Sequence, residues 1–247
     1  MTTPEKKWSK NKSRKGEKEG FIFWKIKAVT FDDFNTLRYP IGTQEDIIYP
    51  IMRVLERKID LNHEEFVKEY FKADMNYRQS LRETLRESLL DDIIVGVLKR
   101  CGLERENIDE MVWAAVNKGL STRKFSWFPE VKKTLNTLRE RNYRLGLISN
   151  THWRIRGNLK KEFEQLFDII TLSYEHGYAK PHPSIFQITI KKMKVTANSC
   201  LHVGDDPIAD IQGARQVGMK TAFIKRGELK AEANMEIRHL GELLTIL

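Results

Sequence analysis

The sequence predicts an α/β fold, in which a doubly wound, Rossmann-like parallel sheet is interrupted by an inserted all-helical cap subdomain. Two observations predict it. After residue 129, short apolar runs rich in β-branched residues alternate with amphipathic helical patterns, which is typical of a parallel sheet covered by helices on both faces. Another apolar run, residues 25–31, is separated from these by residues 39–123, whose periodicity is helical.

The first expected strand is residues 25–31, and the insert after it contains four expected helices. Thr43, three residues before Asp46, is a suitable N-terminal cap for the first helix, and Gly102 and Gly119 end the third and fourth. No strand is expected within the insert. The four helices are residues 43–58, a longer stretch that begins at residue 62, residues 89–100 and residues 106–118.

The second part of the chain supplies the remaining expected strands and their covering helices. Val131 and Leu135 fall on one helix face, which is therefore expected to pack on the sheet. Gly213 is expected to allow close helix–sheet packing, and His182 to be a structural turn residue. The expected strands are 143–149, 169–172, 200–203 and 220–224, and the expected helical segments are 130–141, 162–167, 183–193, 208–217 and 240–247.

Three parts of the chain are expected to be distinct. They are a basic tail over residues 1–20, a core formed by residues 21–38 and 124–247, and the cap over residues 39–123. The tail carries seven basic and three acidic residues and therefore +4 of the formal net charge of +9. Its low hydrophobicity predicts disorder, and we expect it to be functionally silent. Contact with nucleic acid is expected, if anywhere, only at this tail.

The bulk composition is that of a globular enzyme-sized protein. The chain has 247 residues, of which 40% are hydrophobic and 31% charged. It contains no apolar run of the length that spans a bilayer, so no membrane contact is expected. Its two cysteines, Cys101 and Cys200, lack the spacing of a metal site or a disulfide framework, which favours a cytoplasmic location.

Four polar motifs, each at the end of or beyond an expected strand, point to the function. Because open α/β sheets bind ligands beyond the carboxyl ends of their strands, these motifs are expected to converge. A carboxylate that attacks, a hydroxyl and an ammonium that hold an anion, and further carboxylates that hold a cation suit a hydrolase with an aspartyl intermediate. The chemistry-bearing residues of the four motifs are Asp32 with Thr36, Ser149 with Asn150, Lys180, and Asp205 with Asp206 and Asp210.

In this arrangement the chain from residue 25 onward resembles the haloacid dehalogenase-like (HAD) hydrolase superfamily with a helical, C1-type cap. The resemblance implies that Asp32 is the nucleophile and that Thr36 holds the nucleophile loop. Ser149 would bind the transferred anion, together with backbone N–H groups of the loop after Asp32. The residues that the resemblance places around the bound phosphate are Thr36, Asn150, Asp33 and Phe34.

The resemblance also implies a cation and its neutralising partners. Lys180 would neutralise the nucleophile and the transferred group as a compact positive charge. Hard oxygen ligands with room for water suit Mg²⁺. Asp210 would either touch the ion or orient Lys180 and water. The Mg²⁺ ligands that the resemblance implies are Asp32, the backbone carbonyl of Phe34, Asp205 and Asp210.

One position departs from the pattern of the phosphatases in this superfamily. They usually carry a second Asp two residues after the nucleophile, which protonates the leaving oxygen, and here that position is Phe34. Asp33 is a poor substitute, because adjacent residues leaving a strand project to opposite sides. Phe34 is compatible with a carbon–halogen substrate, with a good leaving group on phosphate, with an acid supplied by the cap, and with loss of activity.

Asp205 favours phosphoryl chemistry among these alternatives. The dehalogenases of this superfamily do without a metal, whereas acidic groups crowded around Asp32 are costly without a cation. The favoured function is a Mg²⁺-dependent phosphatase of a small phosphorylated metabolite that forms an aspartyl-phosphate on Asp32. Two alternatives stay open: a 2-haloacid dehalogenase-type hydrolase, and a non-catalytic phosphate-binding or interaction protein.

Overall fold

The computed structural model describes residues 26–42, 45–56, 63–84, 90–122, 124–151 and 163–247. The basic tail and residues 152–162, which follow the second motif, lie outside the described residues. Among the described residues, no helix has both the length and the apolar character that crossing a bilayer requires.

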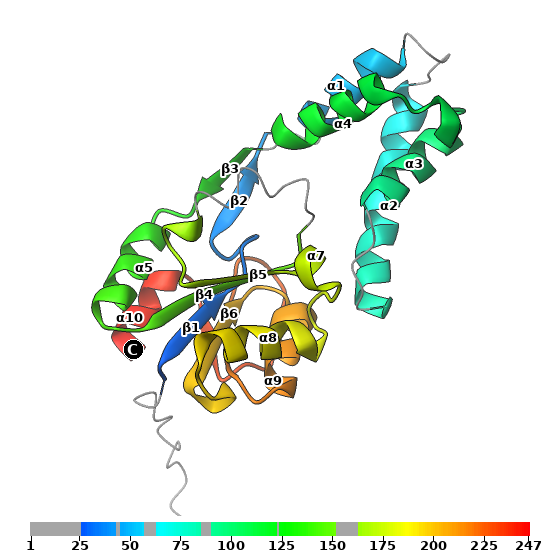
Figure 1. Cartoon of the computed structure of the whole chain (residues 1–247). Helices are drawn as coiled ribbons and strands as arrows, with labels where there is room; N and C mark the ends of the chain where they lie inside the picture. The colour runs from blue at the N-terminus through cyan, green and yellow to red at the C-terminus, as the bar shows by residue number, and fades with distance from the viewer. Residues whose placement is uncertain (1–25, 43–44, 57–62, 85–89, 123, 152–162) are drawn as a thin grey trace, which may run out of the picture.

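The core is a six-stranded parallel sheet (Figure 1). Its strand order is β5-β4-β1-β6-β7-β8, so β1 lies inside the sheet between β4 and β6. This order places the ends of β4, β1 and β6 side by side, and these three strands lead into three of the four motifs. The strands are β1 (Ala28–Phe31), β4 (Arg144–Ser149), β5 (Ile169–Leu172), β6 (Cys200–Gly204), β7 (Lys220–Ile224) and β8 (Met235–Ile237).

Helices cover both faces of this sheet, as alternation along the strands requires. Val29 and Phe31 belong to a cluster with α5 (Val131–Glu140) and α10 (Leu243–Ile246), whereas Ala28 belongs to another cluster with α8 (Pro183–Met193) and α9 (Gly213–Gln216). A doubly wound, Rossmann-like core is therefore confirmed. Gly213 does allow a close approach, but to helix α8 and not to the sheet as predicted, because a Cβ there would lie 2.6 Å from the Phe186 ring.

The insert consists of helices with an apolar cluster of their own. The helices are α1 (Glu45–Leu55), α2 (His63–Thr84), α3 (Leu90–Arg100) and α4 (Glu110–Thr122). In Figure 1, α1 lies along α4 and α2 along α3. Their cluster includes Leu55, Phe66 and Leu98 and shares no residue with the two clusters on the sheet.

A short ribbon joins the insert to the core, and here the sequence-based prediction was wrong. Residues 39–41, expected to be helical, belong to β2 (Arg38–Ile41), which pairs antiparallel with β3 (Lys124–Trp127). Each strand is only four residues long, and β2 contains a proline. Strands this short acquire their order from a partner, and here the partner is remote in sequence.

Smaller differences lie at the ends of elements. The edge strand β8 and the one-turn helix α7 (Ser173–His176) were not expected. The helix expected over residues 208–217 begins as a π-helical segment, Pro207–Gln212, before α9. His182 caps α8, because its Nδ1 accepts the backbone N–H of Ser184 at 3.1 Å, which agrees with the structural role expected for it.

Candidate active site

Asp32 lies directly after β1, at the carboxyl end of the sheet. Its backbone N–H donates to the Val203 carbonyl at 2.9 Å, which extends the pairing of β1 with β6 by one residue. The chain then turns sharply, and Asn35 adopts a φ of 53°. Asparagine tolerates this left-handed conformation better than most residues. The turn closes with the backbone N–H groups of Leu37 and Arg38 both donating to the Asp33 carbonyl.

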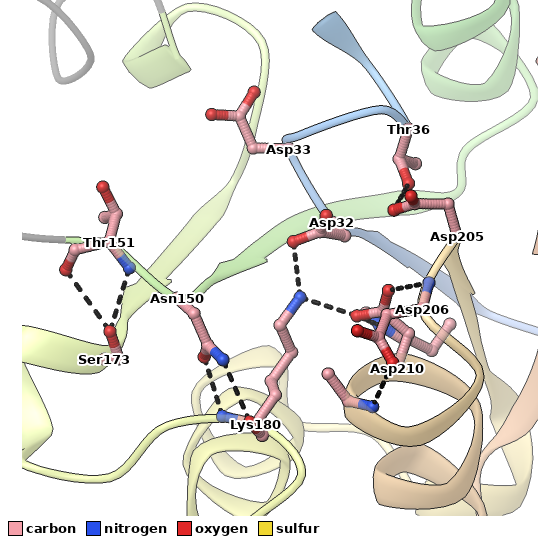
Figure 2. A network of polar contacts seen from close by, with 12 residues as sticks. Asp32, Asp33, Thr36, Asn150, Thr151, Ser173, Lys180, Asp205, Asp206 and Asp210 are labelled. Atoms are coloured by element: carbon pink, nitrogen blue, oxygen red, sulfur yellow. Dashed lines mark hydrogen bonds and ion pairs between the residues drawn. The ribbon is translucent and has the colours of Figure 1, made fainter. Parts of the chain in front are cut away.

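Lys180 lies beside Asp32 and bridges two motifs. Its Nζ donates to Asp32 Oδ1 at 2.5 Å and to Asp210 Oδ1 at 2.6 Å, as Figure 2 shows. Asn150 holds the backbone of Lys180 from both sides, since its Nδ2 donates to the Lys180 carbonyl and its Oδ1 accepts the Lys180 N–H. Asn150 therefore orients the lysine loop from the end of β4.

The acidic motif after β6 uses each of its three carboxylates differently. Asp206 caps the π-helical segment, because its Oδ1 accepts the N–H groups of Ile208 and Ala209. Asp210 Oδ2 accepts the Asp206 N–H at 3.0 Å. The Asp205 side chain accepts a bond from the Thr36 hydroxyl at 3.4 Å, which links this motif to the nucleophile loop.

Three carboxylates of these motifs form a compact acidic cluster. Asp32, Asp205 and Asp210 can each offer an oxygen such that all three oxygens lie within 4.8 Å of one another. Gly204 makes this possible, because a Cβ at that position would lie 2.2 Å from Asp210 Cγ. Only glycine therefore leaves room for the Asp210 carboxylate behind the end of β6.

Burial and crowding shift the acidities in this cluster in opposite directions. Burial raises the pKa of Asp32 well above its ordinary value, and the charges of Asp210 and Asp205 raise it further, against the opposing effect of Lys180. Burial, with the charge of Asp210, also raises the pKa of Asp205 to about 6. For Asp210 burial acts the same way, but the Lys180 ammonium and a bond from His202 outweigh it and lower the pKa.

Lys180 remains an ammonium in this environment. Burial alone would lower its pKa, but the carboxylates of Asp210 and Asp32 outweigh that effect and raise it above the ordinary value. Among the described residues, the cluster therefore combines the carboxylates of Asp32, Asp205 and Asp210 with the ammonium of Lys180. A set of oxygen donors with surplus negative charge is chemically suited to a hard divalent cation such as Mg²⁺, so the residues fit the ion that the sequence predicts.

Asp33 and Phe34 point to the ribbon between core and cap. Asp33 forms a bidentate ion pair with Arg38, with Nε–Oδ1 and Nη2–Oδ2 distances of 2.8 and 2.7 Å, and its side chain is turned away from Lys180 in Figure 2. Phe34 packs edge-to-face on Phe125 of β3, with ring centroids 4.9 Å apart. Both side chains are thus engaged with residues of β2 and β3.

Arg38 was missed by the sequence analysis. Its guanidinium lies over the rings of Phe125, Trp127 and Phe163, 4.5 to 5.4 Å from their centroids. Because the same guanidinium also pairs with Asp33, the Arg38 side chain joins the loop after Asp32 to β3. The only available signal was an arginine directly after the first motif.

The remaining predicted residues lie at the same edge of the sheet. Ser149 is the last residue of β4 and is buried, next in the chain to Asn150. Thr36 is buried as well. His202, whose Nε2 lies 3.3 Å from Asp210 Oδ1, and Thr30, which contacts His202, were not predicted. A histidine in the otherwise apolar run of β6 was the signal that could have revealed them.

Comparison with known families agrees with this geometry. A protein-family model described as haloacid dehalogenase-like hydrolase matches residues 26–218. The chain belongs to this family. The HAD match begins just before β1 and ends after α9, so it contains all four motifs and the insert. The type of the cap stays a prediction.

Several relatives of this HAD chain are named glyceraldehyde 3-phosphate phosphatase. The one from Methanopyrus kandleri is 31% identical over 82% of this chain and 85% of its own length. Those from Pyrococcus abyssi and Pyrococcus furiosus are 40% and 35% identical, but the matches cover only 42% and 50% of this chain. In these two matches the chain spans about half the length of the relatives, namely 46% and 57%.

Solved structures of both reaction classes share the fold. A HAD phosphatase from Thermococcus onnurineus superposes with a TM-score of 0.67 at 26% identity, covering 90% of this chain and 97% of that one. A 2-haloacid dehalogenase from Pseudomonas syringae reaches 0.66 at 24% identity with the same coverage. The fold is therefore compatible with both phosphatase and dehalogenase chemistry, and the residues of the site must distinguish the two.

Proposed function

We propose that this HAD hydrolase is a Mg²⁺-dependent phosphatase that acts on a small phosphorylated metabolite through an aspartyl-phosphate on Asp32. The observation that carries the proposal is the acidic cluster. Asp32, Asp205 and Asp210 lie close together, Lys180 pairs with Asp32 and Asp210, and burial together with the charge of Asp210 raises the pKa of Asp205. A carbon–halogen substrate needs no such cluster, whereas a phosphoryl group bound with a divalent cation does. The phosphatase names of several relatives support the same choice.

Each residue has a defined task in this proposal. The Asp32 carboxylate attacks phosphorus while the bond from phosphorus to the leaving oxygen breaks, and water later hydrolyses the aspartyl-phosphate. Lys180 stays protonated and neutralises the charge that builds on the transferred group. Ser149 and the backbone N–H groups of Asp33 and Phe34 hold the phosphoryl oxygens.

The cation site in this proposal uses Asp32, Asp205 and the backbone carbonyl of Phe34. The bound Mg²⁺ would supply positive charge next to the phosphoryl oxygens. Asp210 was predicted either to touch the ion or to orient Lys180. Its contacts favour the second role, because Oδ1 accepts from Lys180 and His202 and Oδ2 accepts the Asp206 N–H.

Phe34 defines the kind of phosphate that this site is expected to prefer. A positioned acid contributes about 10²- to 10⁴-fold to the expulsion of a poor leaving group. With Phe34 packed on Phe125 and Asp33 paired with Arg38, neither residue next to Asp32 can supply that acid. We therefore expect acyl and aryl phosphates, whose leaving groups need no proton, to react faster than sugar phosphates.

The test is phosphate release from a panel that contains an aryl phosphate, an acyl phosphate and small sugar phosphates. Each is measured with Mg²⁺, with a chelator and with the Asp32→Asn variant. Asp168→Asn is the matched control, because Asp168 Oδ2 accepts the Leu145 N–H at the opposite end of β4. Turnover that needs Mg²⁺ and Asp32 but tolerates Asp168→Asn is the expected result.

Two other outcomes would replace the proposal. If no substrate of the panel releases phosphate and 2-chloropropionate releases halide, the protein is a dehalogenase. If neither phosphate nor halide is released, the results favour the non-catalytic phosphate-binding protein. Equal rates for sugar and acyl phosphates would keep the phosphatase but would show that another group supplies the acid.

A further inference from the structure

A fully buried histidine lies behind the acidic cluster. His202 is in the middle of β6, and its neighbours in that strand are Leu201 and Val203. A polar ring in such a strand is costly unless its nitrogens are hydrogen-bonded. Both nitrogens are within reach of partners: Nδ1 lies 2.9 Å from Thr30 Oγ1, and Nε2 lies 3.3 Å from Asp210 Oδ1.

The protonation of this ring follows from its two partners. Asp210 accepts from the Lys180 ammonium at 2.6 Å and from the Asp206 N–H at 3.0 Å, so it faces His202 as an ionised acceptor and the ring offers it an N–H at Nε2. In the neutral ring Nδ1 then accepts the Thr30 hydroxyl, which lies 2.9 Å away and is also 3.4 Å from the Leu201 carbonyl. Thr30 is the residue of β1 directly opposite His202 in the sheet register. The edge-to-face contact of Phe186, at 5.3 Å between centroids, fixes the plane of the ring.

The oxygen that His202 contacts is the one that positions the lysine. Asp210 Oδ1 accepts from both His202 Nε2 and Lys180 Nζ. The other oxygen, Oδ2, accepts the N–H of Asp206. The Asp210 carboxylate is therefore held at both oxygens by groups other than Lys180. Lys180 in turn donates to Asp32 Oδ1.

We propose that His202, oriented by Thr30, is a positioning residue of the active site. It touches neither substrate nor cation and acts through Asp210, whose carboxylate it holds in the orientation that keeps Lys180 on Asp32. The consequence for turnover rests on the proposed function, whereas the hydrogen-bond arrangement does not. A misplacement of the lysine by a fraction of an ångström is expected to weaken the transition state more than substrate binding.

The kinetic test compares variants that keep or remove the two hydrogen bonds. His202→Leu is expected to lower kcat by about 10- to 100-fold, the usual effect of losing such a supporting partner, with KM within about twofold. His202→Gln, which retains an N–H donor, is expected to recover most of the loss. Thr30→Val is expected to lower kcat less than His202→Leu, and Thr30→Ser to leave it unchanged.

Coupling and a matched control separate positioning from stability. If Thr30 acts only through His202, the double variant His202→Leu with Thr30→Val has the kcat of His202→Leu alone. Thr221→Val is the control, since Thr221 is buried opposite His202 on β7 but bonds to Asn234 and not to the cluster. It is expected to lower the free energy of unfolding without changing kcat.

A measurement on the wild-type protein tests the geometry without any turnover. The ¹⁵N chemical shifts of labelled histidine are expected to show His202 as the neutral form protonated on Nε2. Protonation on Nδ1 would overturn the inference, as would a His202→Leu variant that keeps wild-type kcat or a His202→Gln variant that is as slow as His202→Leu. If the wild-type protein releases no phosphate from any substrate, the proposed function fails, and the protonation site alone decides the inference.

Discussion

Asp205 differs from the other carboxylates of the site because no cation among the described residues contacts it. Lys180 pairs with Asp32 and Asp210, whereas Asp205 receives only a long bond from the Thr36 hydroxyl. Burial of the Asp205 carboxylate and the nearby charge of Asp210 are the two largest effects on it. Together they raise its pKa from 3.8 to about 6. This is the position at which an added cation relieves most repulsion.

A pH dependence of stability follows for the protein without Mg²⁺. Between pH 4 and 6 the folded state holds a proton on Asp205 that the unfolded state has released, so the free energy of unfolding falls as pH rises through this window. The expected loss is about 1–3 kcal/mol, reduced by partial exposure of the side chain. Urea unfolding at pH 4.5 and 7.5 in chelator measures it.

The predicted loss of stability between pH 4 and 6 has two controls, namely the Asp205→Asn variant and the addition of Mg²⁺. The variant is expected to flatten the pH dependence, because it removes the titrating group. Mg²⁺ at pH 7.5 is expected to restore stability in the wild type only, since binding to the folded state alone stabilises it. An equal response of Asp205→Asn to pH would assign the effect to another carboxylate.

At the scale of the elements, the end of β6 is shaped by one glycine. Gly204 leaves the space in which Asp210 approaches the backbone, and a Cβ would overlap that carboxylate. We predict that Gly204→Ala lowers kcat by about 100-fold or more, because Asp210 and with it Lys180 must move. The measurement is phosphate release together with thermal unfolding.

Gly227→Ala is the matched control for this substitution. Gly227 is exposed, and a Cβ there would meet no heavy atom within 4 Å. The variant is expected to keep wild-type turnover and a wild-type Tm within a few degrees. A Gly204→Ala enzyme as active as Gly227→Ala would show that the Asp210 carboxylate does not need its present position.

The start of β2 carries the second element-scale prediction. Arg38→Met removes the bidentate ion pair of a buried carboxylate and is expected to cost about 3–5 kcal/mol of unfolding free energy, because Asp33 loses both charge-assisted hydrogen bonds that the guanidinium donates. Adding Asp33→Leu to this variant is expected to recover much of the loss. Denaturant unfolding of the single and the double variant tests this prediction. An Arg38→Met protein as stable as the wild type would contradict it.

At the scale of the whole molecule, we propose that core and cap are separate folding units. The apolar cluster of the insert contains only residues from Ile51 to Val112, with partly buried neighbours up to Trp113. The connection is the pairing of β2 with β3, in which Ile41 is opposite Lys124. The boundaries predicted at residues 38 and 124 therefore fall at this ribbon.

Excision of the cap tests this proposal. Replacement of residues 42–123 by Asn-Gly joins Ile41 to Lys124 in a two-residue hairpin turn. The shortened protein is expected to unfold in one cooperative transition and to hydrolyse the aryl phosphate with KM raised about tenfold or more, because a lid that supplies substrate contacts is gone. A product without a cooperative transition would show that the core depends on the cap.

Local signals in the sequence are enough to predict five of the six strands of the sheet, the helical insert and the four motifs. Apolar strands, helical periodicity and polar residues at strand ends are local signals, and parallel pairing brings the strand ends to one edge without further information. Asp32, Lys180, Asp205 and Asp210 were predicted in this way, and the structure brings them together.

Which partner each of these groups has could not be predicted from the sequence. Thr30 and His202 are 172 positions apart and meet through strand register, and Arg38 lies over aromatic rings of β3 and beyond, on the other side of the insert. Such contacts depend on register and packing between distant segments, which no local pattern encodes. For the same reason the sequence could predict a role for Asp210 but not its orientation, which follows from Gly204, Asp206 and His202.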